Sequence, residues 1–295
     1  MQANVFVPGH ITGFFEIFLY DDPLYSGSRG CGVVLDKGVI TRAEVMESDR
    51  LEIETFLNGT KTSCDVSKFA VYELLKNERK KYRIKIFHEL QVPMMQGFGT
   101  SGAGALGAVL ALNTALKLNL SLNQCAAIAH KSEVINQTGL GDVIAQVNGG
   151  VVMRIFPGPP GIGVIDKIPY DGYVVVLILG SGIKTKKVLS NCKMRKKINK
   201  VGGECMKLLL KKPTVDNFLR LSQFFSFNTG LITRKAKRVI EELQKYKIRA
   251  SMVMLGNAIF SITEEPENLS ELGYKCIIAK INNEGAKVGK LHFKD

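Results

Sequence analysis

The residues from Pro93 to Gly104 form the stretch of the sequence best suited to bind a charged ligand. They read Pro-Met-Met-Gln-Gly-Phe-Gly-Thr-Ser-Gly-Ala-Gly and lead into a run of Gly, Ala and Leu that predicts a long helix from Ser101. Small residues at a helix start leave backbone N–H groups free to approach an anion, and the helix dipole favours a phosphate there. The stretch is not a P-loop, because Ala103 stands where that motif needs Lys. Tight helix packing through small residues is the alternative interpretation.

Three polar residues further along the chain could complete such a site. His130 and Glu133 are three residues apart on one predicted helix, so they lie on the same face. Asp142 ends the turn Thr138-Gly-Leu-Gly-Asp, just before another apolar segment. Ordinary structural roles would also explain Asp142, as a first-turn acid that the helix dipole stabilises, and Ser101 of the glycine-rich stretch, as a helix cap.

Together these residues suit phosphoryl transfer. That chemistry needs an anion cradle, a Mg²⁺ that bridges the phosphates and a group that orients or deprotonates the attacking hydroxyl. Mg²⁺ takes a few oxygen ligands and keeps several waters, so Ser101 and Glu133 could hold it and leave Asp142 for the nucleophile. Arg154 could grip an anionic acceptor through two parallel hydrogen bonds, or could be a solvated arginine at the end of a strand.

The elements that must position these residues divide into two sets. A soft boundary near residue 172 predicts two α+β lobes, 1–172 and 173–295, with a cleft between them. In the first lobe we expect a hairpin around Asp36-Lys-Gly38, helices at 66–76, 101–118 and 122–136, and strands at 4–7, 12–20, 31–35, 39–46, 51–57, 83–89, 149–156 and 163–168. In the second we expect helices at 193–210, 215–225 and 234–246, and strands at 174–179, 250–255, 274–281 and 287–293.

Composition limits the class of protein. The 295 residues are 45% hydrophobic and 23% charged, which is typical of a globular chain with a sizeable core. The sequence has neither an apolar run long enough to span a membrane nor a secretory signal, so we expect a cytoplasmic protein without a membrane partner. Its 6 cysteines are scattered and form no CxxC pair, which favours reduced thiols over disulfides or a zinc site.

The chain is basic, with 40 Lys and Arg against 27 Asp and Glu and a formal net charge of +13. Such an excess favours anionic partners, either a nucleic acid or a phosphorylated small molecule. An RNA-binding role is the rival interpretation, but the sequence has no RNP-type motif and no basic stretch interleaved with stacking aromatics. We therefore expect no nucleic-acid partner.

The glycine-rich stretch resembles a known phosphate-binding motif. The pattern Pro93-x-x-x-Gly97-x-Gly99-Thr-Ser-x-Ala103 is similar to the PxxxGLGSSA motif of the GHMP kinase superfamily. More specifically, the chain resembles the archaeal pantoate kinase family over essentially its whole length. The resemblance is carried by five segments in the same order: residues 7–15, 27–32, 97–107, 139–146 and 252–256.

The resemblance implies a fold and an activity. The fold would have two lobes, an N-terminal one like a ribosomal-protein domain with a left-handed βαβ unit and a C-terminal ferredoxin-like one. ATP would lie over the glycine loop, and its γ-phosphoryl group would pass to the primary hydroxyl of (R)-pantoate, giving 4-phosphopantoate for coenzyme A biosynthesis. A GHMP-type kinase for another hydroxy acid or a polyol is the alternative. Whether the chain forms a homodimer is left open.

The resemblance also implies roles for single residues. Ser101 and Glu133 would organise Mg²⁺ and the phosphates, and Asp142 would be the base or orienter of the hydroxyl. The residues implied in nucleotide binding are Pro93, Gly97, Gly99, Thr100, Ser101, Gly102, Ala103 and Gly104. Those implied in contacts with pantoate are Ser28, His130, Arg154 and Thr185, with Ser26 close to Ser28 in the same turn.

The sequence departs from the general superfamily pattern in all three motifs. His10 stands where the first motif usually has Lys or Arg, and Phe98 and Thr100 stand where the second has Leu and Ser. The third motif is usually a longer glycine run, whereas the segment Leu255-Gly-Asn-Ala-Ile has one glycine. That segment would contact the acceptor or simply end a strand.

Overall fold

The computed structural model describes residues 1–180, 191–267 and 273–289, and its larger sheet is built on two long antiparallel strands. The sheet has the order β12-β1-β2-β5-β3-β4, and β6 and β7 extend it from β2. Its strands are β1 (Gln2–Phe18), β2 (Gly27–Ser48), β3 (Glu52–Leu57), β4 (Thr60–Lys61), β5 (Lys81–Leu90), β6 (Val151–Phe156), β7 (Val164–Ile168) and β12 (Lys287–Val288).

The predicted hairpin around Asp36 is wrong, because β2 continues through it. Pro8 pairs with Gly38 and His10 with Val34, so β2 accommodates extra residues in a bulge beside β1. This part of β2 bonds to distant segments: the backbone N–H of Val34 donates to the carbonyl of Gly150, and the side-chain carboxylate of Asp36 accepts the N–H of Lys280. The separate strands predicted at 4–7 and 12–20 are likewise one strand, β1.

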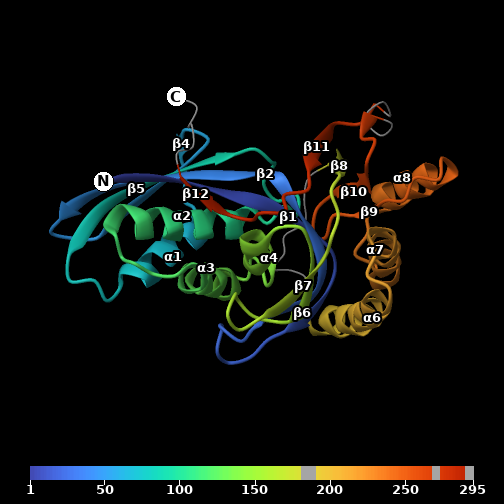
Figure 1. Ribbon diagram of the computed structural model, residues 1–295, viewed down its shortest axis with the longest axis horizontal. Helices are drawn as coiled ribbons and strands as arrows, with labels where there is room; N and C mark the ends of the chain where they lie inside the picture. The colour runs from blue at the N-terminus through green and yellow to red at the C-terminus, as the bar shows by residue number, and fades with distance from the viewer. Residues whose placement is uncertain (181–190, 268–272, 290–295) are drawn as a thin grey trace.

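Helices α1 (Asp65–Leu75), α2 (Thr100–Leu116) and α3 (Leu122–Asn136) cover one face of this sheet (Figure 1). The small residues of α2 let it approach β2 closely, since a Cβ on Gly107 would lie 2.4 Å from Oγ1 of Thr41. Strands β3 and β5 are parallel neighbours joined through α1, which is the βαβ unit expected from the resemblance. The short helix α4 (Asp142–Asn148) lies between α3 and β6.

The smaller sheet has the antiparallel order β11-β8-β10-β9. Its first strand along the chain, β8, therefore lies beside its last, β11, as in ferredoxin-like folds. Helices α6, α7 and α8 pack beside it (Figure 1). The bounds are β8 (Tyr173–Ile178), β9 (Ser251–Met252), β10 (Ala258–Thr263), β11 (Cys276–Lys280), α6 (Cys192–Lys211), α7 (Val215–Thr229) and α8 (Arg234–Lys245). Strand β10 was not predicted, although the pair Gly256-Asn257 between two apolar runs is a hairpin signal.

One hydrophobic core joins the two sheets. The ring of Phe14 on β1 lies 6.3 Å from that of Phe218 and 6.4 Å from that of Phe225, both on α7. Residues after β11 return to the larger sheet, where Ile281 bridges to Leu35 and β12 pairs with β1. The boundary near residue 172 stays a prediction. Within the described ranges, no helix is both long and apolar enough to cross a membrane.

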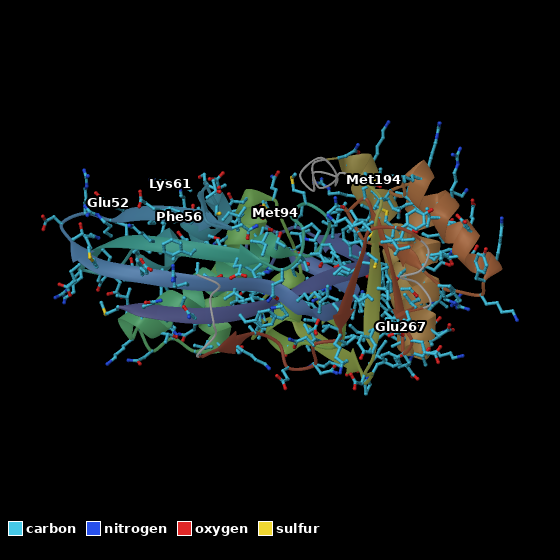
Figure 2. All side chains as sticks on the ribbon, turned by 90° about the horizontal axis from the view of Figure 1, so that it is seen from above. Glu52, Phe56, Lys61, Met94, Met194 and Glu267 are labelled. Atoms are coloured by element: carbon cyan, nitrogen blue, oxygen red, sulfur yellow. The ribbon has the colours of Figure 1, made fainter. Side chains whose placement is uncertain are left out.

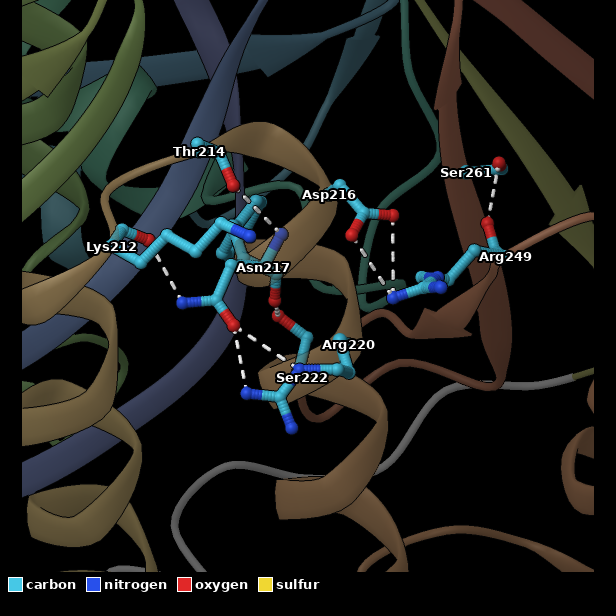
Figure 3. Close-up of polar contacts among 9 residues, drawn as sticks. Lys212, Thr214, Asp216, Asn217, Arg220, Ser222, Arg249 and Ser261 are labelled. Carbon is cyan, nitrogen blue, oxygen red and sulfur yellow. Dashed lines mark hydrogen bonds and ion pairs between the residues drawn. The ribbon is translucent and has the colours of Figure 1, made fainter.

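A polar network fixes the start of α7 (Figure 3). The hydroxyl of Thr214 caps the helix by accepting the N–H of Asn217. The buried Asn217 amide donates to the carbonyls of Leu208 and Lys212 and accepts from the Arg220 guanidinium. These bonds hold α6 and α7 together on the side of the molecule where α7 packs against β1.

Candidate active site

A cavity of about 670 Å³ runs along the glycine-rich loop, a volume typical of small-molecule sites. One end is lined by the start of α1 and by β5, and the other by β1, β6 and the start of α4. Met94, in the loop before α2, lines it and lies between the part of the larger sheet that carries Phe56 and the helical side that carries Met194 (Figure 2). Two ligands, or one elongated ligand, would fit such a shape.

The loop before α2 owes its shape to two glycines in the left-handed region. Gly97 has φ +78° and Gly99 φ +63°, and a Cβ on Gly97 would lie 2.4 Å from the carbonyl oxygen of Met254. Gly99 caps α2, and the first helical bond from the loop is donated by the Ala103 N–H. The N–H groups before Ala103 therefore have no partner within the helix, as the anion-cradle prediction requires.

The eight predicted loop residues differ in what they face. The cavity is lined by Gly97, Gly99, Thr100, Ser101 and Gly104. Ala103 is fully buried in the core, and Gly102 packs against Glu133, with a built Cβ 3.0 Å from Oε2. Pro93 precedes the turn and does not line the cavity. Ala103 and Gly102 thus serve the close packing that the alternative interpretation described, while their neighbours face the open space.

Glu133 on α3 is a buried carboxylate with one free oxygen. Its Oε1 accepts the hydroxyl of Thr138 at 2.6 Å, whereas Oε2 has no hydrogen-bond partner among the described residues. Burial, together with the charge of Asp142, raises the pKa of Glu133, and the hydroxyls of Thr138 and Ser101 offset part of that rise. A buried, unpaired carboxylate oxygen beside a serine hydroxyl is a donor set that fits Mg²⁺.

Gly139 allows the two acidic side chains to converge. A Cβ at this position would lie 2.0 Å from Oε2 of Glu133 and 2.9 Å from Oδ2 of Asp142. Asp142 is the first residue of α4, its side chain is 21% exposed and it lines the cavity. Its Oδ1 accepts a hydrogen bond from Nδ1 of His10 at 2.7 Å. Glu133, predicted to hold the metal, and Asp142, predicted to act on the nucleophile, therefore lie close together beside Gly139.

Arg154 on β6 is buried, so the interpretation as a solvated strand-end arginine is wrong. It is 1% exposed and lines the same end of the cavity as Asp142. Its Nη1 lies 3.3 Å from Nε2 of His10 and its Nη2 3.4 Å from Oγ1 of Thr12, while Nε has no partner among the described residues. A buried guanidinium with an unused N–H is suited to an anionic ligand.

Comparison with known proteins places this arrangement in a family. Residues 66–150 match the family described as "GHMP kinases N terminal domain". The chain is 34% identical to a pantoate kinase of Thermococcus kodakarensis over 98% of its length and 99% of that protein. It is 40% identical to a pantoate kinase of Methanocaldococcus jannaschii over 88% of its length and 93% of that protein.

The chain belongs to the pantoate kinase family. A solved structure titled "Phosphotransferase related to CoA biosynthesis pathway" has a TM-score of 0.88 and 33% identity, covering 98% of this chain and 99% of that one. A homoserine kinase from Cytophaga hutchinsonii has a TM-score of 0.71 at 15% identity over 97% of both chains. The latter similarity shows the two-lobed α+β fold alone, which the resemblance had predicted.

The remaining positions expected from the pantoate kinase resemblance differ in their surroundings. Ser28 lines the cavity, and a Cβ on Gly141 would lie 2.3 Å from its Oγ and 2.7 Å from Nε of Arg154. Ser26 instead bonds to the backbone of Tyr20. The structure thus brings Ser28, rather than Ser26, next to Arg154.

His130 lies behind the cavity wall, and its Nε2 bonds to the carbonyl oxygen of Ser26 at 2.8 Å. Burial lowers its pKa to about 4, so the ring is neutral and donates this bond. Its direct contact with the substrate stays a prediction, and the observed bond steadies the turn that carries Ser28. Thr185 lies outside the described residues.

The segment around Gly256 joins the smaller sheet to the loop before α2. It forms the turn between β9 and β10, and a Cβ on Gly256 would lie 2.2 Å from the carbonyl oxygen of Gln96. Its neighbours Met254 and Leu255 line the cavity. The segment thus ends strand β9, whereas its contact with the acceptor stays a prediction.

Sequence reasoning missed the contacts of His10 and Thr12 with Asp142 and Arg154 at this cavity. Both residues were present in the segment that carried the family resemblance, but His10 was noted only as a departure from the superfamily pattern. The structure places them on β1, directly beside β2 and within reach of Arg154 on β6. Only the pairing of strands distant in sequence brings these side chains together.

Proposed function

We propose that this chain transfers the γ-phosphoryl group of ATP to the primary hydroxyl of (R)-pantoate, giving 4-phosphopantoate in coenzyme A biosynthesis. One observation carries the proposal: an anion cradle, two convergent carboxylates and a buried arginine line or adjoin a single cavity. Two pantoate kinases that match nearly the whole chain support the choice of acceptor.

The nucleotide end of the cavity lies at the start of α2. The N–H groups before Ala103 bind the phosphates, and the open space toward α1 and β5 receives the nucleoside. Ser101 and Glu133 hold Mg²⁺ through the hydroxyl and the unpaired Oε2. When bound, the ion neutralises charge on the phosphates.

The acceptor end lies between Asp142 and Arg154. Arg154 binds the pantoate carboxylate through Nε and the Nη2 hydrogen on the same edge of the guanidinium. Asp142 accepts the proton of the primary hydroxyl at Oδ2, because Oδ1 is engaged by His10. The hydroxyl oxygen is then held beside the phosphate cradle, as an in-line displacement requires.

The basic charge fits this role without an RNA partner. A positive field speeds the encounter with two anionic substrates. A location in the cytoplasm stays a prediction.

A coupled ADP-release assay across a panel of acceptors tests the proposed function. We expect turnover with ATP, Mg²⁺ and (R)-pantoate, and at least roughly a hundredfold lower kcat/KM with homoserine or mevalonate, because a site that pairs buried polar groups rejects a poor match. Phosphorus NMR of the product identifies the esterified hydroxyl. ADP release that does not depend on pantoate, or a preference for another acceptor, would contradict the proposal.

Replacing Arg154 by Lys is expected to raise the KM for pantoate by roughly 10- to 100-fold with a smaller change in kcat. The lysine keeps one charge but loses the second, parallel hydrogen bond, which mainly removes acceptor binding. Steady-state kinetics at saturating ATP give both constants. Arg249→Lys is the matched control, because Arg249 pairs with Asp216 at the surface (Figure 3) and should leave both constants unchanged. An unchanged pantoate KM in Arg154→Lys would contradict the carboxylate contact.

A further inference from the structure

His10 stands between the two residues assigned to the acceptor. Its Nδ1 lies 2.7 Å from Oδ1 of Asp142, and its Nε2 lies 3.3 Å from Nη1 of Arg154. The side chain is fully buried. The ring packs closely against the backbone of β2, since a Cβ on Gly32 would lie 2.2 Å from Nε2. Both ring nitrogens therefore have fixed partners of opposite charge.

These partners select one form of the imidazole. A carboxylate oxygen only accepts and a guanidinium only donates, so Nδ1 carries the proton and Nε2 offers its lone pair. Burial lowers the pKa of His10 and outweighs the opposing effect of Asp142, which agrees with a neutral ring. A Lys or Arg at this position has no acceptor and could not receive the Arg154 hydrogen bond.

The ring determines which atoms remain for the substrate. With Oδ1 engaged, Asp142 presents Oδ2. With Nη1 engaged by His10 and one hydrogen of Nη2 directed at Oγ1 of Thr12, Arg154 keeps the other Nη2 hydrogen and Nε, the atom left without a partner among the described residues. The backbone of His10 also donates to the carbonyl of Phe98, which ties the same residue to the loop before α2.

We propose that His10 is a positioning residue that holds Asp142 toward the acceptor hydroxyl with one ring nitrogen and Arg154 toward the acceptor carboxylate with the other. This inference rests on the proposed function for the identity of the acceptor. It divides the effect of His10 between two kinetic constants, because one partner serves the chemical step and the other serves binding.

Two substitutions separate the two contacts. The amide nitrogen of an Asn at position 10 can replace Nδ1 and donate to Asp142, but the shorter side chain does not reach Arg154. The amide oxygen of a Gln can replace Nε2 and accept from Arg154, while the Asp142 bond is lost. We expect His10→Asn to raise the pantoate KM roughly tenfold with little change in kcat, and His10→Gln to lower kcat roughly 10- to 100-fold with little change in KM.

A purely structural role predicts a different result. Asn217→Ala removes a buried, hydrogen-bonded amide on α7 that does not line the cavity, so it should lower the melting temperature without changing kcat or KM (Figure 3). The kcat and KM of each variant are then measured at the same number of degrees below its own melting temperature, so that differences in stability do not affect the comparison. Parallel changes of kcat and KM in the two His10 variants, no change in either, or the reverse pattern would overturn the proposal.

A second measurement does not depend on the acceptor. Long-range proton–nitrogen NMR of the histidine side chains in the free protein, with the His10 signal assigned by its loss in His10→Asn, reports the tautomer. We expect a neutral ring protonated at Nδ1 near neutral pH. An imidazolium or an Nε2–H tautomer would overturn the proposal, whereas absence of pantoate-dependent ADP release in the unsubstituted protein would contradict the proposed function alone.

Discussion

Replacing Asp142 by Asn is expected to lower kcat for phosphoryl transfer by roughly 10²- to 10⁴-fold while ATP affinity changes by less than about threefold. An Asn keeps the side-chain volume and an oxygen that can accept from Nδ1 of His10, but it cannot take the proton of the hydroxyl. The nucleotide is bound at the start of α2 instead, so its affinity should persist. Single-turnover kinetics and calorimetric titration of ATP with Mg²⁺ measure the two quantities.

Asp216→Asn is the control for this substitution. Asp216 also lies in the first turn of a helix, but at the surface, where its ion pair with Arg249 should be worth less than about 1 kcal/mol. We expect kcat to be unchanged in this variant. Unchanged turnover in Asp142→Asn would remove the assigned role, and equal losses in both variants would point to a general effect of helix-start acids.

Replacing Glu133 by Gln is expected to raise the stability of the free protein at pH 8 and to lower activity at least roughly a hundredfold. Burial raises the pKa of this carboxyl, so the folded protein binds its proton more tightly than the unfolded chain. Stability therefore falls as pH rises from the unfolded value of 4.5 toward about 7, and the full penalty is present above that pH. A neutral Gln avoids the penalty but lacks the charge that holds Mg²⁺.

Thermal melting at a series of pH values checks the sign. The melting temperature of Glu133→Gln should exceed that of the unsubstituted protein at pH 8, and the difference should shrink toward pH 5. ATP with Mg²⁺ should stabilise the unsubstituted protein more than the variant. Glu73→Gln is the control of opposite sign, because Lys131 lowers the pKa of Glu73. A Glu133→Gln protein that is less stable at pH 8 would contradict the buried, unpaired carboxylate.

The helices were predictable because their signals are local. Helix α3 has the bounds predicted for it, 122–136, and its start carries a capping box between Ser121 and Gln124. The predicted start of α2 is one residue late. The Asp36 hairpin was wrong for the opposite reason, since the partners of this part of β2 are distant in sequence: Val34 bonds to Gly150 and Asp36 to Lys280. Pairing between segments so distant in sequence cannot be predicted from the local pattern of apolar and turn residues.

The candidate site also has residues that the sequence predicts and contacts that only the folded structure shows. Ser101 and Asp142 belong to motifs of recognisable sequence, Glu133 was found by its helical spacing from His130, and the structure brings the three together around the glycine loop. The partners of His10 lie 132 and 144 positions away, and no spacing rule connects them. Among the described residues, one oxygen of Glu133 and one nitrogen of Arg154 have no partner, which depends on what surrounds each side chain and is not described by composition or periodicity.

The pairing of β12 with β1 has a consequence for biosynthesis. Val5 leaves the ribosome early, whereas its partner Val288 emerges only after both sheets have otherwise been made. Until then the stretch of β1 at Val5 and Phe6 lacks its strand partner, and an unpaired strand edge can recruit other nascent chains into aggregates. We expect the newly made polypeptide to need chaperone protection during this interval, and its final folding step to be slow because it closes a very long loop.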